Sequence, residues 1–223
     1  MTMKTLLALA LCMAFAAMSF AQERYVKPID EAGEDPSFAA FRKELIEAVE
    51  RKDRKFILSI LDPSIKASFG GHDGESGFVE LWDFNSEDTK FWKEFGVVIR
   101  NGGKWFREDG KRVMFTAPYS FDAFPEDLDA FEHMVVFGER VNLRDKPSLN
   151  SKVITQLSYN VVMVEESTLN GEGGVNGDWY RVKTLGGKSG WISGDYVRSP
   201  IDHRAGFQKK NGQWKMVFFV AGD

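Results

Sequence analysis

Few residues of this 223-residue chain combine the type and the spacing that catalysis or metal binding needs. Its one cysteine, Cys12, lies in an apolar run near the amino terminus, so the chain beyond that run has no cysteine nucleophile and no disulfide. A zinc site needs closely organised ligands, whereas His72, His133 and His203 stand far apart in the sequence. We therefore predict no metal site and no cofactor.

His72 and Asp73 lie in the glycine-dense segment 68–74, where an acid–base pair or an anion cradle is conceivable. Adjacent residues rarely point at one target, and the segment lacks the lysine and the spacing of a phosphate loop, so we interpret it as a tight turn. The chain has no G-x-S-x-G or S-x-x-K serine motif. Its 33 acidic residues leave a glycosidase-type pair of carboxylates open. We predict no catalytic residue.

The first 21 residues have the layout of a secretory signal peptide. Met1–Lys4 is positively charged, Thr5–Phe20 is apolar and uncharged, and small residues stand at positions 19 and 21. The apolar run is shorter than the ~20 residues that a membrane-spanning helix needs. We expect cleavage after Ala21 and export to the periplasm or the cell exterior, with no membrane span after cleavage.

The composition of the chain after Ala21 argues against one class of partner and indicates a folded core. Loss of Lys4 leaves 28 of the 29 basic residues against 33 acidic ones, a net charge of −5. Nucleic-acid binding depends on clustered Lys and Arg, so we expect no nucleic-acid partner. The whole chain holds 19 Phe and 6 Trp, which is typical of a packed domain rather than of a disordered linker.

The spacing of apolar residues indicates several helices after a polar leader, 22–36. Asp35-Pro36 and Asp53 have the residue types that begin helices. Asp62-Pro63 is expected to end the second helix, and Ser86 is expected to begin a later one.

Two strands are expected in residues 104–117, because Asp109-Gly110 is a strong signal for a hairpin turn. Together with the helices, this hairpin predicts a helix-rich α+β domain with a small antiparallel sheet over residues 37–133.

Between Val141 and Val197 the apolar pattern changes from helical to strand spacing. Three motifs follow one another there: VNLRDKPS at Val141–Ser148, GDWYRVK at Gly177–Lys183, and GWISGDYV at Gly190–Val197. In this order, over about sixty residues, they resemble a bacterial SH3 domain. The glycine-rich loop 170–177 is longer than the compact form of such domains. The resemblance is limited to about residues 139–199, and the N-terminal half resembles no family that we recognise.

The resemblance implies a small β-barrel of five or six strands that binds cell-wall peptides or proteins rather than catalysing a reaction. The interior of so small a barrel is filled, so a ligand must bind on its surface. Aromatic residues near the loops could form an apolar shelf with a polar rim, although Trp179 and Trp191 also belong to the strand signature and can serve as barrel core. The candidate ligand-binding residues are Trp179, Tyr180, Trp191, Tyr196, Asp145 and Asp195.

The tail, 203–223, predicts a second hairpin, because Asn211-Gly212 is a strong turn signal. Alternation predicts that Trp214, Met216, Phe218 and Val220 share one face of the last strand, and that Val217 and Phe219 share the other. A strand so apolar on both faces is unsuited to a free edge, so we expect the tail to pair with the hairpin at 104–117 and complete the N-terminal domain. The SH3-like module would then be an insertion.

The resemblance and the predicted signal peptide together indicate an exported, non-catalytic cell-envelope protein. Its expected partner is a cell-wall peptide, another wall component or an envelope protein. Two alternatives stay open: a cell-wall hydrolase with an unrecognised N-terminal catalytic domain, and a module that only braces the other half. The oligomeric state is not predicted.

Overall fold

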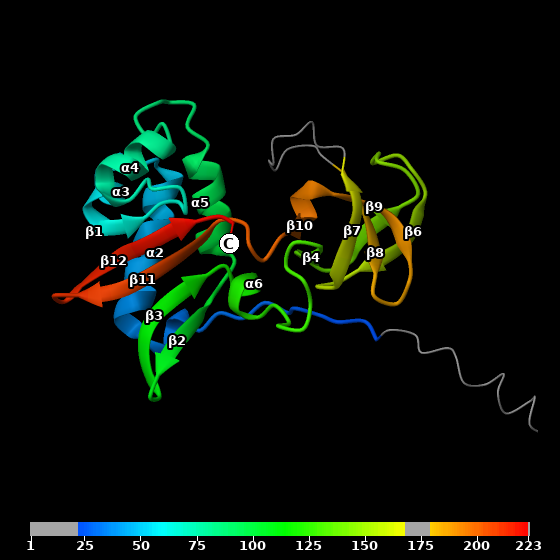
Figure 1. The fold of residues 1–223 in the computed structure, drawn as a ribbon, viewed down its shortest axis with the longest axis horizontal. Helices are drawn as coiled ribbons and strands as arrows, with labels where there is room; N and C mark the ends of the chain where they lie inside the picture. The colour runs from blue at the N-terminus through cyan, green and yellow to red at the C-terminus, as the bar shows by residue number, and fades with distance from the viewer. Residues whose placement is uncertain (1–21, 168–178, 223) are drawn as a thin grey trace, which may run out of the picture.

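The computed structural model describes residues 22–167 and 179–222. The predicted signal peptide and the predicted loop 170–177 lie outside these ranges. The described residues form two sheets with helices, in agreement with the predicted α+β class, and the two sheets lie in two parts side by side (Figure 1). We call them the helical part and the strand part. Within the described ranges, no helix is long and apolar enough to cross a membrane.

The helical part contains a five-stranded sheet and nearly all of the helical residues. Its helices are the short 3₁₀ helix Ala32–Glu34, α2 (Pro36–Glu50), α3 (Arg54–Ile60), α4 (Gly74–Leu81), α5 (Phe91–Arg100) and α6 (Tyr119–Asp122). Its strands, in sheet order, are β1 (Leu61–Lys66), β12 (Gln213–Val220), β11 (Arg204–Lys210), β3 (Lys111–Ala117) and β2 (Lys104–Glu108).

One face of this sheet carries the core. α2, α3 and α5 cover it (Figure 1), and their aromatic side chains pack on those of the strands. Phe38 of α2 and Phe115 of β3 are fully buried, with ring centroids 4.3 Å apart. Such aromatic packing explains how a chain without disulfides in its described residues can hold a stable fold.

The C-terminal hairpin lies in the middle of the five-stranded sheet. β11 pairs with β3 in antiparallel fashion, with Phe207 opposite Phe115, and β12 pairs with β11 on one side and β1 on the other. This is the pairing that the sequence predicts for the tail. Both strands are therefore covered along both edges.

α3 ends at Ile60, directly before Leu61 and Asp62-Pro63, as the sequence predicts. The strand that follows was not predicted: Asp62 and Pro63 lie within β1, which pairs in parallel with β12. Pro63 is compatible with this strand because β1 is at the edge of the sheet.

Ser86 does not begin a helix, contrary to the prediction. α5 begins at Phe91, whose N–H donates to Thr89 Oγ1 at 3.3 Å, while Ser86 Oγ accepts from the N–H of Asp88 at 3.2 Å. The N-cap residue of α5 is Lys90, which forms no capping bond through its side chain.

The predicted alternation along β12 is also wrong. Phe207 of β11 lies opposite Met216, but the preceding Gly206 lies opposite Phe218, so Val217 is an extra residue in a β-bulge. The bulge shifts the alternation, and Met216 and Phe219 are both fully buried in the same core cluster.

Asp62 on β1 is buried and forms an ion pair with Lys210 of the C-terminal hairpin, whose side chain is partly exposed. Lys210 Nζ lies 2.6 Å from Asp62 Oδ2, and the N–H of Ser64 donates to Asp62 Oδ1 at 3.0 Å. The Lys210 bond, followed by the Ser64 hydroxyl, lowers the pKa of Asp62 to about 2. The stability that the ionised Asp62 carboxylate gives the fold is therefore complete above pH 4 and is lost as the pH falls through 2.

Asp62→Asn is expected to lower the free energy of unfolding at pH 7 by about 1–2 kcal/mol, because the amide cannot replace the charge-assisted bond and Lys210 is only partly shielded from solvent. Urea denaturation measures the difference. Asp88→Asn, the same change at an exposed site, should alter stability by less than about 0.5 kcal/mol. Equal effects of the two variants would contradict a stabilising ion pair.

The strand part contains a seven-stranded sheet. Its strands, in sheet order, are β10 (Val197–Arg198), β4 (His133–Val136), β7 (Val161–Ser167), β8 (Trp179–Thr184), β9 (Ser189–Ser193), β5 (Val141–Arg144) and β6 (Val153–Leu157). β4 precedes the segment predicted for the module, and it adds a strand through its pairing with β7. The hydrogen-bonded order is linear, with β10 and β6 at its ends, so the closed barrel stays a prediction.

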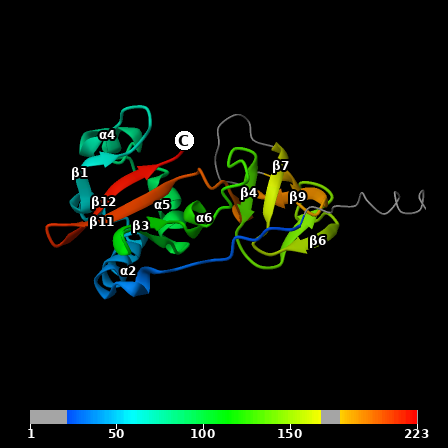
Figure 2. The ribbon, with the colours of Figure 1, turned by 60° about the horizontal axis from the view of Figure 1, so that its bottom comes forward.

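The N-terminal leader connects the two parts. It runs along both of them in Figures 1 and 2. At the strand part, Val26 N–H donates to Tyr159 O at 2.8 Å, and Val161 N–H donates to Arg24 O at 2.9 Å. At the helical part, Glu31 N–H donates to Gly103 O at 3.0 Å. The leader is thus an ordered strap rather than a free extension.

Candidate functional site

A surface groove at one end of the strand part brings two of the predicted aromatic residues together. We call it the Trp179–Tyr196 groove. It encloses about 200 Å³. Its lining residues are Glu139, Arg140, Val141, Asn142, Arg144, Leu149, Trp179, Ser193 and Tyr196.

The ends of two strands and a short helix position the aromatic wall of the groove. Trp179 opens β8 and lies opposite Ser193, the last residue of β9. Ser193 Oγ accepts from the N–H of Asp195 at 3.4 Å and so begins the 3₁₀ turn Gly194–Tyr196. Tyr196 stands at the end of this turn with 49% of its surface exposed. The wall therefore combines a half-buried indole with an accessible phenol ring.

The turn between β5 and β6 forms the opposite wall. Arg144 Nη1 donates to Ser151 O at 2.7 Å, and Ser151 Oγ donates to Lys146 O at 2.8 Å, so the turn is held by its own side chains. Leu149 at its tip is 72% exposed. Because these bonds fix the turn, an apolar side chain is presented to solvent by an ordered backbone.

The other predicted residues do not line the groove. Tyr180 follows Trp179 on the same strand and therefore points to the other face, where it packs against the core of the strand part. Trp191 is half-buried on β9, opposite Arg144 and Arg181. Asp145 and Asp195 are exposed outside the lining.

Arg140, Arg144 and Leu149 line the groove but were not predicted from the sequence. Arg144 and Leu149 lie within or just after the motif Val141–Ser148, so the signal was present in the segment that carried the resemblance. Their position near Trp179 depends on the fold, because β5 reaches β9 through a long-range pairing in which Arg144 lies opposite Trp191.

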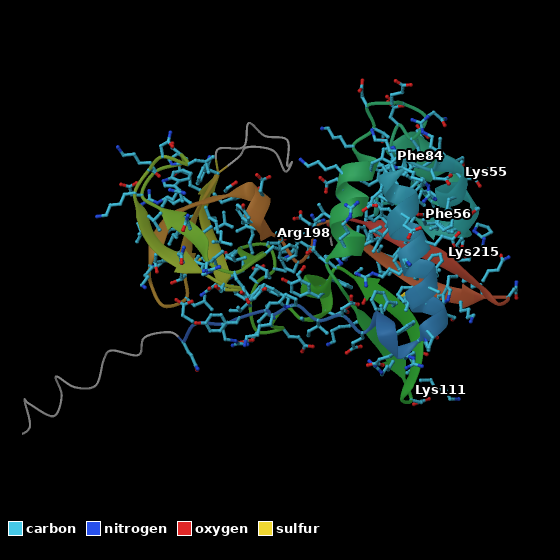
Figure 3. The ribbon with its side chains drawn as sticks, turned by 180° about the vertical axis from the view of Figure 1, so that it is seen from behind. Lys55, Phe56, Phe84, Lys111, Arg198 and Lys215 are labelled. Carbon is cyan, nitrogen blue, oxygen red and sulfur yellow. The ribbon has the colours of Figure 1, made fainter. Side chains whose placement is uncertain are left out.

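A second pocket, of about 280 Å³, lies between the two parts. Tyr180 reaches it from the strand part, and Trp82 and His203 line it from the helical part. Arg198 lies between the parts (Figure 3), where its Nη2 donates to His203 O at 2.9 Å and its Nη1 lies 3.9 Å from a carboxylate oxygen of Glu94.

His203 is uncharged at neutral pH. Burial, and then the charges of Arg198 and Arg204, lower the pKa of its imidazole to about 4. Its ring packs on Trp82 at a centroid distance of 4.8 Å. The residue thus serves as a packed neutral ring at the junction of the two parts.

The three histidines contact different groups. His72 Nδ1 lies 3.3 Å from Ser68 Oγ, His133 Nδ1 lies 2.9 Å from Asp129 O, and His203 Nδ1 lies 3.9 Å from Glu94. Within residues 22–167 and 179–222, no group of three or more His, Cys, Asp or Glu residues is arranged to hold a metal ion.

The groove lies in a segment of the chain that matches a known protein family. The family model for the bacterial SH3 domain matches residues 139–198. This segment is a bacterial SH3 domain. The match contains every residue that lines the Trp179–Tyr196 groove. Bacterial SH3 domains are generally cell-wall binding modules. The N-terminal half has no family match, and no curated protein matches the chain.

Proposed function

We propose that the protein is exported to the cell envelope, performs no catalysis, and binds a cell-wall component, a peptide or a partner protein through its bacterial SH3 domain. The observation that carries this proposal is the position of the Trp179–Tyr196 groove, which lies wholly within the family match. The domain acts as a small barrel whose filled core leaves only its surface for recognition.

The chemistry of the groove supports binding of an extended chain. Trp179 and Tyr196 supply aromatic surface with a polar tip, a combination that recurs where peptides are recognised. Leu149 adds an apolar contact on the opposite side.

Tyr196→Ala should weaken binding to insoluble cell wall by about tenfold, because it removes an exposed aromatic ring that lines the groove. Co-sedimentation of residues 22–223 with purified wall, over a range of wall concentrations, measures the apparent affinity. Phe131→Ala is the matched control. Phe131 is an aromatic residue just before β4; it is 71% exposed and lies outside the groove.

Unchanged binding by Tyr196→Ala, or equal losses in both variants, would contradict a role for the groove. Loss in Tyr196→Ala alone would support it. Circular dichroism of each variant verifies that the exposed substitutions leave the fold intact.

A further inference from the structure

The Trp179–Tyr196 groove has a charge imbalance that indicates the chemistry of its occupant. Its lining carries two guanidinium groups, Arg140 and Arg144, and one carboxylate, Glu139. Among the described residues, neither guanidinium lies within 4.0 Å of a carboxylate oxygen. Other arginines do form ion pairs, among them Arg24, Arg42, Arg51, Arg100, Arg107, Arg112, Arg181 and Arg198.

We propose that the groove selects an acidic peptide, whose free carboxylate is bound by Arg140 and Arg144 while its apolar portion packs against Tyr196 and Leu149. This inference rests on the proposed function and names the chemical class of the ligand. A planar guanidinium matches a carboxylate with two parallel N–H···O bonds, which gives direction as well as attraction.

Both arginines are positioned by the fold. The bond from Arg144 Nη1 to Ser151 O orients its guanidinium and uses one of its five N–H donors. The backbone N–H of Arg140 donates to Ser158 Oγ at 2.9 Å, so the backbone that carries this exposed side chain is fixed as well. The backbone that carries both arginines is therefore fixed before a ligand carboxylate binds, which lowers the entropy lost on binding.

The neighbouring turn adds further positive charge. Lys146 and Lys152 are exposed there beside one acidic residue, Asp145. Although the whole chain is acidic, this end of the domain carries a net positive charge. That charge attracts anions, and the range of the attraction decreases as the salt concentration rises. Binding should accordingly weaken as the salt concentration rises from about 50 to 500 mM.

The test compares native insoluble wall with the same wall after carbodiimide-catalysed amidation of its carboxyl groups. Wild-type residues 22–223 should bind the amidated wall at least about tenfold more weakly, because both charge-assisted contacts are lost. Arg140→Gln should bind native wall about three- to fivefold more weakly, and amidation should weaken its binding by a smaller factor than it weakens the wild type, because only the Arg144 contact remains to be lost. Lys188→Gln removes the same charge from an exposed turn outside the groove and should bind like wild type.

Equal binding to native and amidated wall would overturn the inference and leave the proposed function standing. Equal losses in Arg140→Gln and Lys188→Gln would also overturn it, because the effect would then come from net charge alone. If the wild type fails to bind native wall, wall binding, the part of the proposed function on which this inference rests, is contradicted.

Discussion

Replacement of Phe219 by alanine is expected to lower the free energy of unfolding by about 3–5 kcal/mol. Phe219 on β12 is fully buried, and the ring centroids of Trp82, Phe91 and Phe95 lie 5.0, 5.8 and 5.0 Å from its own. β12 is paired along both edges, so the backbone cannot readily move to fill the cavity. Guanidinium denaturation followed by tryptophan fluorescence measures the loss.

Phe131→Ala provides a control with the same chemical change. Because Phe131 is 71% exposed, its replacement should change the free energy of unfolding by less than about 0.5 kcal/mol. A loss below about 1 kcal/mol for Phe219→Ala would mean that the C-terminal strand is not an integral part of the helical core.

Lowering the pH from 7 to 5 should lower the free energy of unfolding by about 2 kcal/mol through the titration of His203 alone. The pKa of this imidazole falls from its ordinary 6.5 to about 4 on folding, so the unfolded chain binds a proton in this range and the folded chain does not. The contribution of neutral His203 to the free energy of unfolding is therefore complete above pH 6.5 and is lost as the pH falls toward 4. Burial and the nearby Arg198 and Arg204 are the causes.

His203→Gln removes this titration. The variant should be less stable than wild type at pH 7, because the ring contacts with Trp82 and Phe219 are lost, but its stability should decrease less between pH 7 and pH 5. Urea denaturation at both pH values gives the two differences. An identical decrease in wild type and variant would show that His203 is not held neutral.

Features set by local chemistry could be predicted from the sequence. Asp35 and Asp53 accept bonds from the first N–H groups of α2 and α3, as their residue type indicates. Asp109-Gly110 and Asn211-Gly212 all have positive φ, as the tight turns of these hairpins require.

Features set by distant partners could not be predicted. β1 is a strand because β12, about 150 residues later, pairs with it, and no local pattern reveals this pairing. The bulge at Val217 has the same origin, since its register is fixed by Gly206 and Phe207 on β11.

The candidate site was predicted in part. The motifs located the bacterial SH3 domain and two of the groove residues, Trp179 and Tyr196. Tyr180 could have been separated from Trp179 by sequence reasoning, because neighbours on a strand point to opposite faces. Arg140 could not have been placed in the groove, since its position depends on how the β5–β6 hairpin folds against β8 and β9.

We propose that this protein binds cell wall and does not hydrolyse it. Incubation of purified residues 22–223 with insoluble cell wall, followed by assay of both the pellet and the supernatant, tests this proposal. We expect the protein to enter the pellet and no soluble wall fragments to be released. Release of fragments would contradict it in favour of a hydrolase, and protein that stays in the supernatant would contradict wall binding.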